Sequence, residues 1–178
     1  MALHDTPVSM LKESLNENLT VVEYCLAYRK EDNGCLGYPA AMLLFSIVDT
    51  IGSYFRKNKD LKIRIDGKLR LIDSDGYKHF FILNSPYFEQ QLPEEAIKTL
   101  YAKFRSLLTH NSVLGAKAML LLGNNHDLGA FLKGKANGTE VYIVSLTQFY
   151  ALCKRAVERF LNDADEIVPK SKQGARFQ

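Results

Sequence analysis

Apolar residues recur at steps of three and four near the start of the chain, which is the spacing of one buried helix face. The series begins at Val8 and ends at Leu26. Thr6-Pro7 precedes it, and these residue types favour the N-cap and the first helical position. The pattern therefore predicts an amphipathic helix that ends at about Arg29.

A second predicted helix begins near Pro39 and is apolar on most sides. A helix of this kind is usually buried at the centre of a domain. One polar stripe interrupts it and contains Asp49. A carboxylate is costly to bury without a partner. Two interpretations of Asp49 stay open: it belongs to a salt bridge or core network, or it faces a functional site.

The next segment changes to an alternation of apolar and polar residues around Asp66-Gly67. This alternation is typical of a β-hairpin with an Asp-Gly turn. We expect a hairpin-like insertion at about 61–83, within which the short stretch His79 to Leu83 has no clear assignment.

Two further helices are predicted in the second half of the chain. One begins at Pro93, with Glu94 and Glu95 at its positive end, and continues to about Asn111. The other opens at Ser145-Leu146-Thr147-Gln148, a capping-box pattern. Between them, Asn137-Gly138 is suited to join two short strands.

These elements predict a mainly α fold, a bundle of about four main helices with small inserted β-hairpin elements. The length of 178 residues suits one buried core. We expect a single helical domain over 1–163 and a flexible basic tail over 164–178.

Composition narrows the class of protein. Hydrophobic residues make up 47% of the chain, but the longest apolar run, Ala40 to Phe45, is too short to span a bilayer. The three cysteines form no Cys-x-x-Cys pair, and the first residues do not resemble a secretory signal. We therefore expect a cytoplasmic protein that is not inserted in a membrane.

The positive charge is concentrated locally. Residues 56–70 hold seven basic residues against Asp60 and Asp66. Such a segment could meet a polyanion such as RNA, although a solvated turn has the same composition. The candidate RNA-binding residues are Arg56, Lys57, Lys59, Lys62 and Arg64.

Arg105 and His110 are the residues best suited to chemistry. An arginine offers a fixed fork of donors for a phosphate, and a histidine exchanges protons near neutral pH. Five helical positions turn the chain by about 500°, so in an unbroken helix these two side chains point to different sides. They would converge only if the helix ended near Thr109 or if a second copy supplied the partner group. Cationic residues at a helix C-terminus are also favoured by the helix dipole.

The segment Tyr101-x-x-Phe104-Arg105-Ser106-x-Leu108-x-His110-Asn111 resembles the signature of the HEPN superfamily. That signature is an arginine, four to six residues and a histidine near the end of a bundle helix. Many members have asparagine, aspartate or histidine after the arginine, whereas this chain has Ser106. The resemblance implies a homodimeric endoribonuclease that needs no metal, of toxin or defence type. His110 would then act as general acid or base, and Arg105 would hold the scissile phosphate.

Asp49 could orient His110 or pair with Arg105, and Ser106 and Asn111 could add polar contacts. Two alternatives to a free ribonuclease remain: a non-catalytic helical dimerisation or RNA-binding module, and a toxin subunit held by an antitoxin protein. The four histidines show no paired ligand spacing, and no glycine-rich nucleotide motif occurs. We therefore expect neither a metal nor a cofactor.

Overall fold

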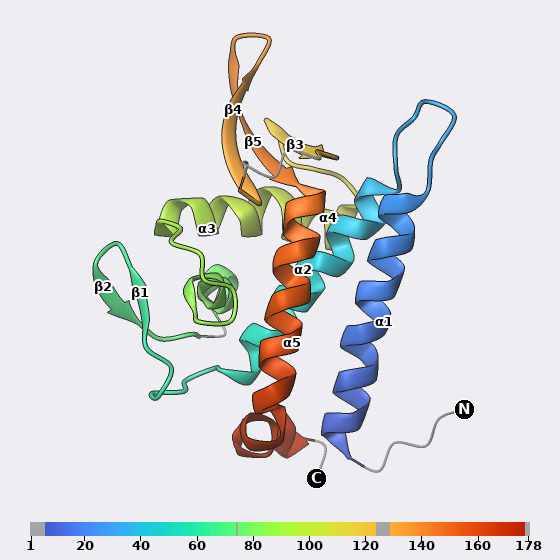
Figure 1. Ribbon diagram of the computed structural model, residues 1–178. Helices are drawn as coiled ribbons and strands as arrows, with labels where there is room; N and C mark the ends of the chain where they lie inside the picture. The colour runs from blue at the N-terminus through green and yellow to red at the C-terminus, as the bar shows by residue number, and fades with distance from the viewer. Residues whose placement is uncertain (1–5, 74, 124–128, 177–178) are drawn as a thin grey trace.

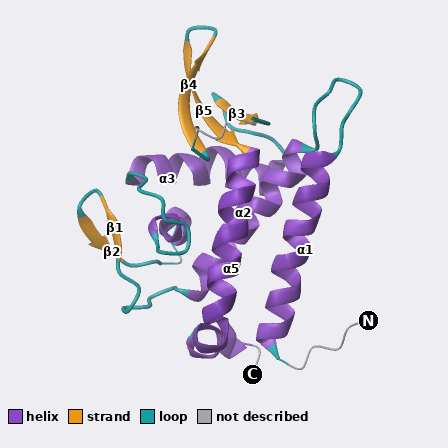
Figure 2. Cartoon of the chain, in the orientation of Figure 1, coloured by secondary structure: helices purple, strands orange, loops and turns teal. Residues whose placement is uncertain are grey.

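Three long helices form the centre of the fold in the computed structural model, which describes residues 6–73, 75–123 and 129–176. They are α1 (Pro7–Ala27), α2 (Gly37–Tyr54) and α5 (Leu146–Lys170), and they pack side by side, with the start of α1 and the end of α5 at the same end of the bundle (Figure 1). Helices dominate the described chain (Figure 2), which confirms the predicted mainly α class.

The first helix begins as its sequence predicts. Thr6 is the N-cap. Its hydroxyl accepts a hydrogen bond from the backbone N–H of Ser9 at 3.1 Å, and the Ser9 hydroxyl oxygen accepts one from the backbone N–H of Thr6. Pro7 occupies the first turn. Leu15 and Val22 bury the apolar face of α1. The helix ends at Ala27, close to the predicted Arg29.

The core gathers around α2. Phe45 contacts the rings of Phe80, Phe104 and Phe149, with centroid distances of 6.0, 6.1 and 4.9 Å. These rings come from four different elements, and all four are at most 1% exposed. Tilted or offset pairs of this kind add to the hydrophobic stabilisation of a core. The prediction that α2 is a central buried helix is confirmed.

The third predicted helix is a composite. It consists of α3 (Glu94–Leu100), the π-helical segment η2 (Tyr101–Ser106) and α4 (Leu107–Asn111). Pro93 is the N-cap rather than the first helical residue. A π turn holds one extra residue and is usually short and local. The apolar pattern of the segment is that of one continuous helix, so this interruption could not be predicted from it.

A small antiparallel hairpin and a helical turn follow α2. Strands β1 (Ile63–Ile65) and β2 (Lys68–Arg70) pair across Asp66-Gly67, as predicted. The insertion expected over 61–83 is only partly β, however. The 3₁₀ segment η1 (Gly76–Asn84) occupies its second half, because its apolar residues are buried in the helical core instead of alternating across a sheet.

A second sheet has three strands in the order β3-β5-β4 (Figure 2). The hairpin of β4 (Phe131–Ala136) and β5 (Thr139–Ser145) turns at Asn137-Gly138, as predicted. Strand β3 (Ala118–Leu121) was not predicted and pairs parallel to β5. Ser145 caps α5 but makes no side-chain capping bond, so the expected capping box does not form there.

The last helix extends beyond the predicted end of the folded part. We expected a tail from residue 164, but α5 continues to Lys170 and is followed by the 3₁₀ turn η3 (Gly174–Arg176). Ala164 and Val168 explain the difference, because both are buried against the core. Across the described residues, no helix combines the length and the apolar character needed to cross a bilayer.

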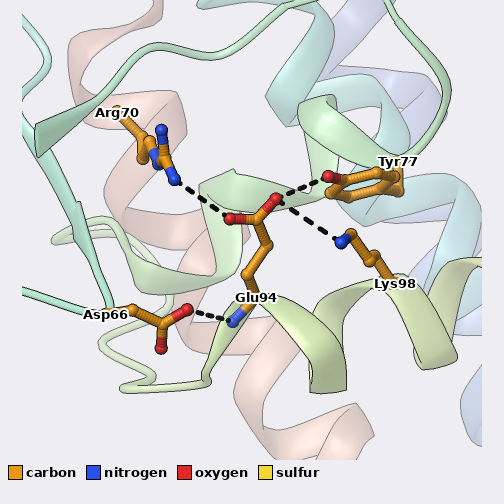
Figure 3. A network of polar contacts seen from close by, with 5 residues as sticks. All are labelled: Asp66, Arg70, Tyr77, Glu94 and Lys98. Atoms are coloured by element: carbon orange, nitrogen blue, oxygen red, sulfur yellow. Dashed lines mark hydrogen bonds and ion pairs between the residues drawn. The ribbon is translucent and has the colours of Figure 1, made fainter. Parts of the chain in front are cut away.

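One polar network ties the hairpin, η1 and α3 together around Glu94 (Figure 3). Its carboxylate accepts the Tyr77 hydroxyl at 2.5 Å and pairs with Arg70 at 3.2 Å and Lys98 at 3.8 Å. Asp66 accepts the backbone N–H of Glu94 at 3.2 Å. The Tyr77 hydrogen bond lowers the pKa of Glu94, partial desolvation opposes this shift, and the two cations add to the lowering.

We predict that Glu94→Gln lowers the free energy of unfolding at pH 7. A depressed carboxyl pKa stabilises the fold above the ordinary value of 4.5, and this contribution is lost as the pH falls through the folded-state value. The deficit of the variant should therefore shrink as the pH falls below about 4.5. Urea unfolding of the parent and the variant at pH 7 and pH 3 measures this difference in stability.

Glu95→Gln is the matched control, since Glu95 lies on the same helical turn but is exposed. A deficit for Glu94→Gln that is equal at both pH values, or no larger than that of the control, would contradict this role for the network.

Candidate functional site

Asp49 joins three elements of the fold through its carboxylate. Its Oδ2 accepts the Nε–H of Arg105 from η2 at 2.5 Å, and its Oδ1 bonds Nε2 of His79 from η1. The three side chains are 20%, 22% and 9% exposed in the order Asp49, Arg105, His79. The sequence left open whether Asp49 would orient His110 or pair with Arg105, and in the structure it pairs with Arg105.

His79 reaches Asp49 because η1 lies very close to α2. Gly52 is the residue that allows this approach: a Cβ at position 52 would lie 2.5 Å from the backbone oxygen of His79. The imidazole also packs edge-on against the rings of Phe80 and Tyr101, at centroid distances of 5.1 and 5.5 Å. Sequence reasoning missed His79. The available signal was a polar residue directly before the apolar run Phe80-Phe81-Ile82-Leu83.

A carboxylate only accepts hydrogen bonds, so Nε2 of His79 carries the proton in the bond to Asp49. The other ring nitrogen, Nδ1, is enclosed and has no hydrogen-bond partner among the residues that the structure describes. An enclosed nitrogen cannot touch a substrate in this conformation. We therefore interpret His79 as a positioning residue, which holds the Asp49 carboxylate in place for Arg105.

The π segment η2 places Arg105. Phe104 remains fully buried in the core, while the next residue reaches Asp49. The Arg105 guanidinium also lies over the Tyr101 ring, with its Cζ 5.4 Å from the centroid. The loop after α4 contacts this segment, since the Gly115 N–H donates to the Lys103 carbonyl at 2.7 Å. π turns in helices frequently occur at functional sites.

His110 lies apart from this cluster. It is exposed in the last turn of α4, which ends at Asn111 before Ser112 in the left-handed conformation, with φ of 55°. Among the described residues, no hydrogen bond, ion pair or ring contact joins Arg105 to His110. Because the helix runs past Thr109 to Asn111, the condition for convergence within one chain is not met, which leaves the second condition, a partner group from another copy.

The supporting residues are likewise separate from Arg105. Ser106 is half-buried at the end of η2, and Asn111 is exposed at the end of α4. Neither makes a side-chain hydrogen bond within the described part of the chain. The structure therefore brings Asp49 to Arg105, adds His79, and leaves Ser106, His110 and Asn111 outside the cluster.

The candidate RNA-binding residues divide between two hollows of about 680 Å³ each. Arg56, Lys57 and Lys59 line one, near the end of α2. Lys62 and Arg64 line the other, beside the first hairpin. In the described ranges, no group of three or more histidine, cysteine or acidic residues is placed to hold a metal ion.

We predict that Asp49→Asn destabilises the fold by about 2–4 kcal/mol, because it leaves a half-buried guanidinium without its carboxylate. Urea unfolding at neutral pH measures the change. The control is Asp60→Asn, which removes an exposed carboxylate and should stay within about 0.5 kcal/mol of the parent. Equal stabilities of Asp49→Asn and the parent would show that the cluster contributes nothing to folding.

Gly52→Ala should also destabilise the protein, by roughly 1–3 kcal/mol, since the added methyl group meets the His79 backbone. Alanine favours a helix more than glycine does. A loss of stability in Gly52→Ala would therefore come from the contact with the His79 backbone and not from helix propensity. Thermal unfolding provides the measurement. Ser46→Ala, at an exposed position of the same helix, is expected to be neutral or slightly stabilising. A stabilised Gly52→Ala variant would mean that η1 does not lie this close to α2.

Comparison with known proteins identifies no relative of this chain. No protein-family model, no curated protein and no solved structure matches the chain. The function must therefore be argued from the Asp49–His79–Arg105 cluster, from His110, and from the charged surface around them.

Proposed function

We propose that this protein is a HEPN-like endoribonuclease that cleaves RNA by 2′-hydroxyl attack without a metal and works as a homodimer. The observation that carries the proposal is the ion pair between Arg105 and Asp49. Arg105 lies five positions before His110, an exposed histidine on the same composite helix. A guanidinium held in one orientation is suited to stabilise charge that develops on a phosphate.

Arg105 would hold the scissile phosphate. A guanidinium has five N–H donors in a planar fork. The bond to Asp49 uses Nε, so the terminal nitrogens are the ones that would contact phosphate oxygens. Asp49 and His79 would act through Arg105, since Asp49 fixes the orientation of its fork and His79, the most buried of the three, holds Asp49.

His110 would transfer the protons. As general base it would take the proton of the ribose 2′-hydroxyl, whose oxygen then attacks the phosphorus. The bond from phosphorus to the 5′-oxygen breaks, the leaving oxygen takes up a proton from a general acid, and a 2′,3′-cyclic phosphate remains. An exposed imidazole at a helix end can meet a substrate without rearrangement.

Two copies of the chain would be needed for this reaction. Arg105 is bonded inward to Asp49, whereas His110 is exposed beyond it on α4. One side chain is thus part of the half-buried cluster and the other faces the surface, so the two side chains of one copy do not meet. We therefore propose that the motifs of two copies face each other across a shared cleft, in a HEPN-like arrangement of the helices.

A second candidate is a non-catalytic dimerisation or RNA-binding module. The observation that favours it is that Arg105 already has a carboxylate partner and an aromatic neighbour within its own chain. Such an arginine could serve the architecture alone. This candidate expects RNA binding without cleavage, and no effect of His110 on binding.

We predict that His110→Ala folds normally and loses RNA cleavage by at least about 100-fold, the usual minimum contribution of a general acid or base. A quenched fluorescent RNA in the presence of EDTA measures the rate, and thermal unfolding checks the fold. Thr109→Ala is the control, because Thr109 is an exposed neighbour on the same helix. It should cleave like the parent.

Cleavage by His110→Ala at the rate of the parent would refute the assignment of His110. If the parent itself binds RNA but leaves it intact, the non-catalytic module is the better description. A sedimentation measurement that finds only monomers at assay concentration would exclude the shared cleft.

A further inference from the structure

Two basic segments that are far apart in the sequence meet at one hollow of the surface. The first is the turn that follows α2, and the second is the end of α5 with the residues after it. The hollow measures about 680 Å³, which is within the usual range for pockets that bind small molecules. Its walls carry five cationic side chains: Arg56, Lys57, Lys59, Lys170 and Lys172.

The carboxylates at this hollow only partly offset these cations, because five positive charges against three negative ones leave a net charge of +2. They are Asp60, Asp163 and Glu166. Asp163 accepts the Tyr87 hydroxyl at 2.9 Å, and Glu166 pairs with Lys170 at 2.7 Å. Two of the three carboxylates are thus already engaged by the protein.

The remaining four cations have no carboxylate of their own. In the described part of the chain, no ion pair involves Arg56, Lys57, Lys59 or Lys172. Within the described residues the Nε of Arg56 is enclosed and has no hydrogen-bond partner, so a ligand in the hollow would meet Arg56 through its other guanidinium atoms.

The basic turn is held in shape before any ligand arrives. Lys57 has the left-handed φ of 61°, and its N–H donates to the Ile72 carbonyl at 2.9 Å. The Asn58 side chain accepts the N–H groups of Asp60 and Leu61 at 2.8 and 3.3 Å. A site whose backbone is already ordered loses less conformational entropy when it binds a ligand.

Part of the wall is aromatic. Tyr54, Phe55 and Tyr87 line the hollow beside the cations. The Phe55 and Tyr87 rings pack on each other at 5.2 Å, and Tyr87 is the more exposed of the two, since Phe55 is only 3% exposed. A ligand that fits this lining combines a phosphate with a flat or apolar part.

We propose that this hollow binds the phosphate group of a nucleotide. Arg56 would contact phosphate oxygens through its planar fork, and the lysines would act as point charges. The binding of this group requires neither Arg105 nor His110, so the inference goes beyond the proposed nuclease. The proposal also divides the basic segment that the sequence suggested for RNA binding. Three of its residues line this hollow together with Lys170 and Lys172, whereas Lys62 and Arg64 line the other hollow.

Calorimetric titration of the full chain with adenosine 5′-monophosphate, adenosine and inorganic phosphate tests the proposal. Adenosine 5′-monophosphate should bind at least tenfold more tightly than adenosine. The double variant Lys57→Glu, Lys59→Glu should weaken that binding at least tenfold. The double variant Lys133→Glu, Lys135→Glu makes the same charge change at exposed positions of β4, and it should bind like the parent.

The phosphate could belong to a free nucleotide or to the 5′ end of an RNA strand. Titration of the His110→Ala protein with an RNA hexamer, with or without a 5′-phosphate, separates these sources. A phosphorylated hexamer that binds more tightly than adenosine 5′-monophosphate identifies the RNA end, and equal or weaker binding identifies a free nucleotide.

Three results would contradict the proposed site. The first is no binding of adenosine 5′-monophosphate or of the 5′-phosphorylated hexamer, and the second is equal affinity for adenosine and its monophosphate. The third is an equal loss of affinity in the two double variants. Since none of these measurements involves cleavage, they stand apart from the test of His110.

Discussion

The carboxylate of Asp49 is the constraint on which the candidate site depends. A charged group on the most buried helix must find partners, because its desolvation is otherwise too costly. The partners come from two other elements, His79 on η1 and Arg105 on η2. One side chain thus fixes three segments relative to one another. The same contacts hold a guanidinium in a single orientation, which is what a phosphate-binding arginine requires.

Close backbone approach makes this arrangement possible. Gly52 lets η1 lie against α2, and Gly115 lets the loop after α4 lie against the π segment, where a Cβ would be 2.9 Å from the Lys103 Cα. The Gly115 N–H satisfies the Lys103 carbonyl at this point. The extra residue of the π turn is therefore supported by its surroundings, and the fold keeps Phe104 in the core while Arg105 reaches Asp49.

Charge is distributed in two ways on this molecule. At Asp49, and at Glu94 as Figure 3 shows, acids and bases are paired across elements and stabilise the fold. Around the ends of α2 and α5, most of the cations lack such partners. Charges that are paired within the chain serve mainly its architecture, whereas unpaired cations around a hollow attract anions from outside. This contrast supports the proposed ligand of phosphate type.

The sequence alone determined the capped start at Thr6-Pro7, a buried helix from about Pro39 that in the structure begins at Gly37, and the two hairpins turning at Asp66-Gly67 and Asn137-Gly138. It also singled out Asp49 and Arg105. Tertiary structure decided the rest, including the 3₁₀ segment with His79, the π turn, the parallel strand β3, and the extension of α5 to Lys170. Periodicity reports which residues are apolar, but the energy of a buried carboxylate or of a basic hollow depends on segments that only the folded chain brings together.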